Sequence, residues 1–229
     1  WGIVALATAA IYVLCNAKST VLRLDQLSYL ALLLFVYLTT FWMLPDLLKG
    51  VLAVAALAIL GSCALRARGM HLGLLGLLLL SLPLIATLQF YLGYPLRLVS
   101  TVMCAEILSI FGFPVDVMGT SLHWLGELIV VDAPCGGIKM LWVGLYLNFT
   151  LACFANLSTW HTWVSYSLST GIIFLGNLLR ITALFFVESG IVQAPDQVHV
   201  VVGLFSFLIV TILVWYLNAM LKGREVRHA

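Results

Sequence analysis

Seven long apolar runs limit what this chain can fold into. They cover roughly residues 2–17, 27–44, 51–65, 72–92, 137–157, 162–188 and 199–220. Runs of about 20 apolar residues are typical of helices that cross a bilayer, although the first and third runs are short for this. Only 9% of the 229 residues are charged, against about 25% in a soluble domain. The sequence therefore predicts an all-α polytopic membrane protein with about seven transmembrane helices in a lipid bilayer.

The basic residues between the runs predict the orientation of these helices. If the spans alternate, seven basic residues fall on one side and only Lys49 and Arg97 on the other. The seven are Lys18, Arg23, Arg66, Arg68, Lys222, Arg224 and Arg227. Loops rich in Lys and Arg stay in the cytoplasm. We therefore expect a multi-pass protein of the plasma (inner) membrane, with a cytoplasmic C-terminus and residues 93–136 outside.

The long segment before the fifth run differs from the rest of the chain. Residues 96–111 are apolar with Arg97 and Glu106 interspersed, which indicates an interfacial helix. Further on, 115–117 and 128–131 have strand character and are separated by Gly119 and Gly126, which predicts a small extracytoplasmic hairpin. We divide the chain into N-terminal transmembrane helices (1–94), an extracytoplasmic interfacial segment (95–136), and catalytic transmembrane helices with a cytoplasmic tail (137–229).

A cysteine stands where this segment enters the fifth run. Ala133-Pro134-Cys135-Gly136-Gly137-Ile138-Lys139 places Cys135 at the mouth of a long helix. Unpaired backbone N–H groups and the positive end of the helix dipole favour a thiolate there. Cys135 is therefore a candidate nucleophile, and Lys139, one turn later, is a candidate cation beside it. The alternative interpretation of a lone membrane cysteine is packing.

Two further polar residues are predicted to reach the same depth as Cys135. Arg180 lies 18 residues into the sixth run, or about 27 Å at 1.5 Å per residue. This brings it near the outer edge of a hydrocarbon core about 30 Å thick. His199 begins the seventh run on the outer side. A thiolate, an imidazole base and a fixed cation are the groups that cleavage of a peptide by a cysteine enzyme needs.

Several neighbours have open roles. Asn177 precedes Arg180 by three residues and so shares its helix face, where it would orient the guanidinium or donate to the oxyanion. His123 is a second candidate base, in a region expected to be a loop. Glu188 and Asp196 are both candidates for orienting His199 or Arg180, and the sequence does not choose between them. Arg180 in isolation is equally consistent with snorkelling to the interface.

Composition argues against other classes of function. The net charge of +2 and the absence of a basic patch give no support to nucleic-acid binding. The five cysteines have no CxxC spacing, so we expect no metal and no cofactor, while a Cys104–Cys135 disulfide stays open. The main alternative function is a transporter or channel with Arg180 and Lys139 as an anion path. Against it, the sequence has no inverted repeat.

Three short motifs resemble those of the exosortase/archaeosortase family of membrane transpeptidases. They are the Cys135 stretch quoted above, Gly176-Asn177-Leu178-Leu179-Arg180-Ile181, and His199-Val200-Val201-Val202-Gly203. The resemblance covers about residues 95–220. Gly136 stands where the family usually has Ser, and Lys139 where it usually has Arg, so we expect a divergent subgroup.

The resemblance implies a substrate and a reaction. Family members recognise a C-terminal sorting signal on exported, membrane-anchored proteins, made of a short motif such as Pro-Glu-Pro, one membrane helix and a basic tail. They cleave near the motif at the outer face through a cysteine thioester. With water as acceptor the enzyme is a protease, and with an amine it is a transferase; the sequence leaves both open.

Overall fold

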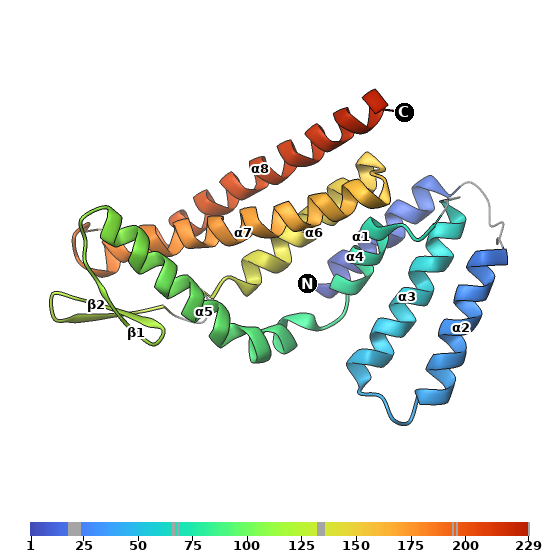
Figure 1. Cartoon of the computed structure of the whole chain (residues 1–229), viewed down its shortest axis with the longest axis horizontal. Helices are drawn as coiled ribbons and strands as arrows, with labels where there is room; N and C mark the ends of the chain where they lie inside the picture. Colours follow the sequence, from blue (N-terminus) through green and yellow to red (C-terminus); the bar gives the residue numbers. More distant parts are fainter. Residues whose placement is uncertain are drawn as a thin grey trace. The chain divides into compact units, whose positions relative to one another are not determined.

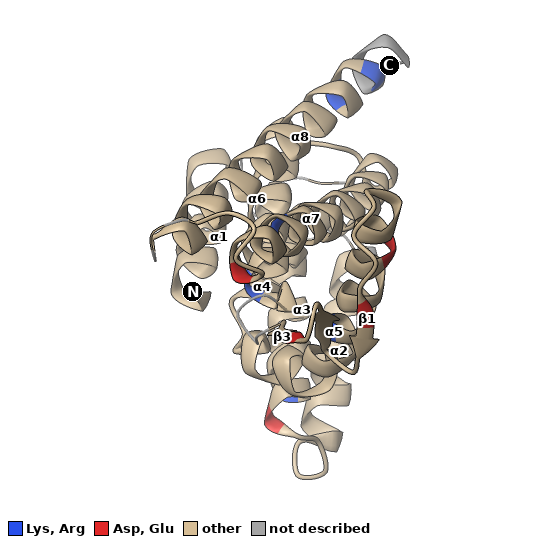
Figure 2. Cartoon of the chain, turned by 90° about the vertical axis from the view of Figure 1, so that its left-hand side faces the viewer, with Lys and Arg blue, Asp and Glu red and all other residues tan. Residues whose placement is uncertain are grey.

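Eight helices and three short strands make up the described part of the protein in a computed structural model (Figure 1). The description covers all residues except 18–23, 66, 68, 132–135, 194, 196 and 229. The elements are α1 (Gly2–Asn16), α2 (Leu24–Thr40), α3 (Asp46–Ala64), α4 (Leu72–Leu80), α5 (Leu84–Ile110), β1 (Asp116–Met118), β2 (Ser121–Trp124), β3 (Glu127–Val130), α6 (Ile138–Ala155), α7 (Thr159–Glu188) and α8 (Val198–His228). Figure 2 shows how few of these residues carry a charge.

Four of the described helices are long and apolar enough to cross a membrane: α3, α6, α7 and α8 as far as Arg224. The pair α4 and α5 counts as a fifth if it forms one broken span. Two further helices, α1 and α2, are apolar but have 15 and 17 residues. The polytopic all-α class is confirmed, while the number of seven spans stays a prediction.

The fourth predicted span breaks in a different place from the one expected. It was predicted to run from 72 to 92, followed by a separate interfacial helix at 96–111. Instead, α4 ends at Leu80, and α5 runs without interruption from Leu84 through Pro95 to Ile110. Pro83 explains the break, because it has no N–H to donate and it disfavours helical geometry in the preceding Leu82. The predicted interfacial segment is therefore the second half of one long helix.

The predicted hairpin is a sheet of three antiparallel strands in the order β1-β2-β3. Sequence reasoning found β1 and β3 but missed β2, which lies between them and pairs with both. Gly119 and Gly126 lie in the two turns as predicted, with φ of +63° and +89°. Leu125 precedes Gly126 with φ of +50°, so both central residues of that turn have the positive φ of a type I′ hairpin.

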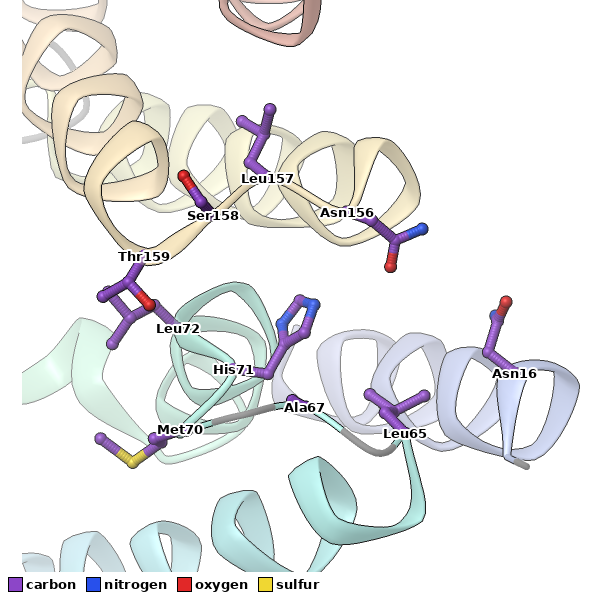
Figure 3. Close-up of a pocket in the computed structure, with 11 residues that line it drawn as sticks. Asn16, Leu65, Ala67, Met70, His71, Leu72, Asn156, Leu157, Ser158 and Thr159 are labelled. Carbon is purple, nitrogen blue, oxygen red and sulfur yellow. The ribbon is translucent and has the colours of Figure 1, made fainter. Parts of the chain in front are cut away.

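The chain forms two compact units. The first consists of Trp1–Leu84, Tyr146–Ser167 and Leu217–Ala229, and the second of Ile85–Leu145 and Leu168–Tyr216. In the first unit, a core of apolar side chains joins α1, α3, α4 and the second half of α6. It also has a cavity next to the α6–α7 turn, into which His71 and Asn156 project (Figure 3).

The core of the second unit fixes the sheet to the helices that carry the candidate site. Buried residues of α5, the sheet and α7 form one cluster: Cys104, Ala105, Leu108, Leu122, Ile129, Val131, Leu178, Ile181 and Phe185. Trp124 of β2 lies edge-on to Phe185, with ring centroids 5.8 Å apart. Cys104 is a free thiol with no exposed surface. Because aromatic and aliphatic side chains interlock here, the sheet and the C-terminal half of α7 form one packed body.

Candidate active site

The turn that follows Cys135 fits closely against α7. Cys135 itself lies outside the described residues, but Gly136 and Gly137 are described and buried. Gly137 has φ of +81°, a conformation that favours glycine. A Cβ placed on it would lie 2.8 Å from Nδ2 of Asn177. Its carbonyl accepts the hydrogen bond from Leu141 N–H that starts α6. Both the backbone geometry and the contact with Asn177 therefore favour a glycine at this position.

The other side of the same turn is packed against α5. A Cβ on Gly136 would lie 3.0 Å from Cγ of Arg97 and 3.9 Å from the carbonyl oxygen of Gly93. Arg97 donates from Nε to that carbonyl oxygen at 3.2 Å. Arg97 was predicted as an interfacial residue and not as part of the site. The structure places its side chain beside the residue that follows Cys135.

Asn177 and Arg180 lie on one face of α7, as their spacing predicts. Asn177 is only 2% exposed. The guanidinium of Arg180 lies against Gly203 of α8, where an added Cβ would be 3.5 Å from Nε and 3.7 Å from Cζ. Nε of Arg180 is buried and has no hydrogen-bond partner among the described residues. This N–H group can therefore still donate a hydrogen bond to a bound molecule.

His199 is paired with Glu188. Nε2 of His199 lies 3.1 Å from Oε1 of Glu188, and the two side chains are 45% and 48% exposed. Glu188 is the last residue of α7, and His199 is in the first turn of α8. The structure therefore joins His199 to Glu188, one of the two carboxylates that the sequence left open; Asp196 lies outside the described residues.

The remaining candidates lie elsewhere. Lys139 is exposed in the first turn of α6. His123 is not in a loop but in the middle strand, opposite Asp116 and Leu128. In the described part of the chain, no group of three His, Cys, Asp or Glu side chains is placed to hold a metal ion.

These contacts connect four elements. The residues after Cys135 touch Asn177, which is one helical turn from Arg180; Arg180 touches Gly203, which is one turn from His199. The described groups along this series of contacts are thus two guanidinium groups and an amide, with the carboxylate-paired imidazole of His199 one helical turn from Gly203. Such a set is suited to holding an anionic, oxygen-centred intermediate and to moving a proton.

Comparison with known proteins finds a matching family model. The family model described as transmembrane exosortase matches residues 1–216, which include α1 to α5 as well as the three motif regions. No curated protein and no solved structure matches the chain. Exosortases are membrane-embedded cysteine transpeptidases that act on exported proteins with C-terminal sorting signals. With nearly its whole length matched, the chain belongs to the transmembrane exosortase family.

Proposed function

We propose that this protein cleaves the C-terminal sorting signal of exported proteins at the extracytoplasmic membrane face, through a thioester on Cys135. His199 is the acid and base, and Arg180 stabilises the oxyanion. The observation that carries the proposal is the unused, buried Nε donor of Arg180, one helical turn from Asn177 and the Gly137 turn that follows Cys135.

Acylation follows from these assignments. The Cys135 sulfur attacks the scissile carbonyl carbon, a C–S bond forms, and the carbonyl oxygen becomes an oxyanion. Arg180 donates to that oxygen as its charge develops, an interaction typically worth about 10²–10³ in rate. His199 takes the thiol proton and passes it to the leaving amine as the C–N bond breaks. The product is a thioester that retains the exported protein.

Deacylation repeats these roles. Water or an amine attacks the thioester carbonyl, His199 removes the proton from the attacking group, and the C–S bond breaks to restore the Cys135 thiol. With water the reaction is hydrolysis, and with an amine it is transfer. The exposure of His199 supports access of either acceptor to the base.

The supporting residues have separate roles in this scheme. Gly136 and Gly137 allow the turn after Cys135 to approach Arg97 and Asn177 closely. Asn177 positions that turn, and shares a helix face with Arg180. Lys139 is exposed, so we assign it a contribution to the local positive potential without a contact to the reacting atoms.

The membrane geometry of the proposal follows the basic loops. We place the site at the outer face of the plasma membrane and the Lys222–Arg224 end of α8 in the cytoplasm, because loops rich in Lys and Arg remain there. A site at the outer rim suits a substrate whose scissile bond lies just outside its membrane helix.

Replacing the nucleophile tests the proposal. Cells producing an exported reporter that ends in a Pro-Glu-Pro motif, one apolar helix and a basic tail are followed by immunoblotting. The wild type should process the reporter, while Cys135→Ala should stop processing without lowering the amount of membrane-inserted enzyme. Cys104→Ala is the matched control at a buried thiol and should process normally. Unchanged processing by Cys135→Ala would exclude the proposed mechanism.

A further inference from the structure

We propose that the outer edge of β3, which ends five residues before Cys135 in the chain, is the docking surface for an extended segment of the substrate, which pairs with it as a fourth strand. This inference rests on the proposed function and adds to it the mode of substrate recognition. It starts from which residues of β3 form backbone hydrogen bonds to β2 and which do not.

The register determines which backbone groups of β3 point outward. The two-residue turn Leu125–Gly126 makes Trp124 and Glu127 a hydrogen-bonded pair, and pairs of this kind alternate along an antiparallel ladder. The hydrogen bond from Val131 N–H to the Thr120 carbonyl, at 3.0 Å, continues this alternation one pair beyond β3. Glu127, Ile129 and Val131 therefore bond to β2.

The alternate residues, Leu128 and Val130, direct their N–H and C=O groups to the free edge. Among the described residues, neither of them has a backbone hydrogen bond to a segment on that outer side. Their side chains are 56% and 53% exposed, whereas Ile129 between them is 8% exposed. A free edge of this kind is a template for an added strand.

This edge is held rigidly with respect to the candidate catalytic helix. Ile129 and Val131 are buried in the same core as Leu178 and Ile181, which flank Arg180 in sequence. An edge that is fixed relative to the oxyanion donor can position a bound peptide at low entropic cost, because neither partner surface has to be ordered on binding.

The short stretch of chain between β3 and Cys135 indicates what binds at this edge. Cys135 follows Val130 by five residues, so the nucleophile is at most about 18 Å from the end of the edge. A paired peptide advances about 3.3 Å per residue, and a segment of a few residues therefore spans this distance. A nucleophile that follows an open strand edge by five residues in the chain suits an extended peptide with a scissile bond, which is the substrate class of the proposed function.

The second edge of the sheet, on β1, provides a matched control. By the same argument, the Met118–Ser121 pair closes the Gly119–Thr120 turn, so Val117 is the β1 residue whose N–H points outward. The residues of β1, Asp116–Met118, are 17 to 19 positions before Cys135, and β2 and β3 lie between them in the chain. Its edge does not lead directly to the nucleophile.

Proline substitutions at outward-facing positions test the β3 edge against the β1 edge. Each proline removes one edge N–H while leaving the ladder to β2 intact, because prolines are tolerated on edge strands with that side free. Val130→Pro and Leu128→Pro should each slow reporter processing about three- to tenfold, the effect of one backbone hydrogen bond. Val117→Pro should process at the wild-type rate. The full-length enzyme is used throughout, with the reporter described above.

Two measurements distinguish loss of docking from loss of folding. Thermal unfolding midpoints of the three proline variants should agree, and Cys135 should react with iodoacetamide at the wild-type rate in each. Equal processing by Val130→Pro and the wild type would overturn the docking proposal while leaving the Cys135 mechanism in place. A change in oligomeric mass with unchanged processing would also overturn it, since the occupant would then be a second copy. Processing that survives Cys135→Ala would instead remove the proposed function itself.

Discussion

Buried polar side chains are satisfied differently in the two compact units. In the first unit, Oγ of Ser165 lies 2.7 Å from Oδ1 of Asn148 and 3.0 Å from Oδ1 of Asn218, and Nδ2 of Asn218 donates to Asn148 Oδ1 at 2.9 Å. All three residues are at most 3% exposed. In the second unit, the described part of the chain leaves Nε of Arg180 and Oγ of Ser100 buried without a partner.

This contrast separates a stabilising region from a reactive one. A buried network of side-chain hydrogen bonds rigidifies the segments that it joins, whereas an unused buried donor costs stability. Proteins keep an unsatisfied buried group mainly where that group binds or acts on a ligand. We therefore expect substitutions in the first unit to affect stability, and substitutions around Arg180 to affect activity.

The largest expected effect is at Arg180. Arg180→Lys keeps the charge but loses the planar fork and the Nε donor, so processing should fall about 10²- to 10³-fold. The unfolding midpoint should stay unchanged or rise, because an unpartnered buried N–H is removed. Reporter processing and thermal unfolding of the same preparation measure both quantities. Arg224→Lys, exposed in α8, is the control. Near-normal processing by Arg180→Lys would remove the oriented-donor role.

The next effect concerns the turn after the nucleophile. Gly137→Ala forces an L residue to φ of +81° and brings its Cβ to 2.8 Å from Asn177 Nδ2. Backbone strain alone is about 1–3 kcal/mol, and the contact adds to it. We expect at least a tenfold loss of processing. Gly203→Ala is the matched variant, because its Cβ would meet Arg180 at ordinary contact distances of 3.5 Å and more. Equal losses in both variants would contradict the steric argument.

Hydropathy predicted the helices well because a bilayer-spanning helix must be apolar along its length. It did not place the break before α5, since Leu82 and Pro83 are as apolar as their neighbours and only the proline marks the site. The strand β2 had a usable signal: Ser121-Leu122-His123-Trp124 alternates polar and apolar residues between two glycine turns.

The site was predictable to the extent that its motifs lie on single helices. The i, i+3 spacing of Asn177 and Arg180 gave a shared face directly. No periodicity relates Arg97 to Gly136, which are 39 positions apart in the sequence, and the choice of Glu188 as partner for His199 depends on how α7 ends relative to the start of α8. Such contacts are set by tertiary packing, which a single sequence does not display.

A smaller effect is expected in the polar network of the first unit. Asn218→Ala leaves Oδ1 of Asn148 and the hydroxyl of Ser165 with fewer partners in a buried site. The cost should be about 1–3 kcal/mol of unfolding free energy, seen as a lower midpoint of thermal unfolding. Processing per folded molecule should not change. Asn16→Ala, at an exposed amide of α1, is the control. A loss of processing without loss of stability would contradict the expectation that substitutions in the first unit affect stability and not activity.

The smallest expected effect is a pH dependence that originates at His71, in the cavity of the first unit (Figure 3). Burial lowers the pKa of His71 below its ordinary value of 6.5. Nδ1 accepts the Leu74 N–H at 3.3 Å, and Nε2 lies 3.4 Å from the Tyr12 hydroxyl, which itself donates to Asn156 at 2.9 Å. This arrangement fits a neutral imidazole with its proton on Nε2.

Protonation of His71 should therefore destabilise the fold. The unfolded chain takes up the proton near pH 6.5 and the folded chain only at lower pH, so the stability that neutral His71 supplies is present above pH 6.5 and is lost as the pH falls below it. The thermal unfolding midpoint should drop between pH 7.5 and pH 5.5, and His71→Gln should flatten that drop. His161→Gln, at the start of α7, should keep it. If the unfolding midpoint of His71→Gln falls with pH as steeply as that of the wild type, the pH dependence comes from groups other than His71.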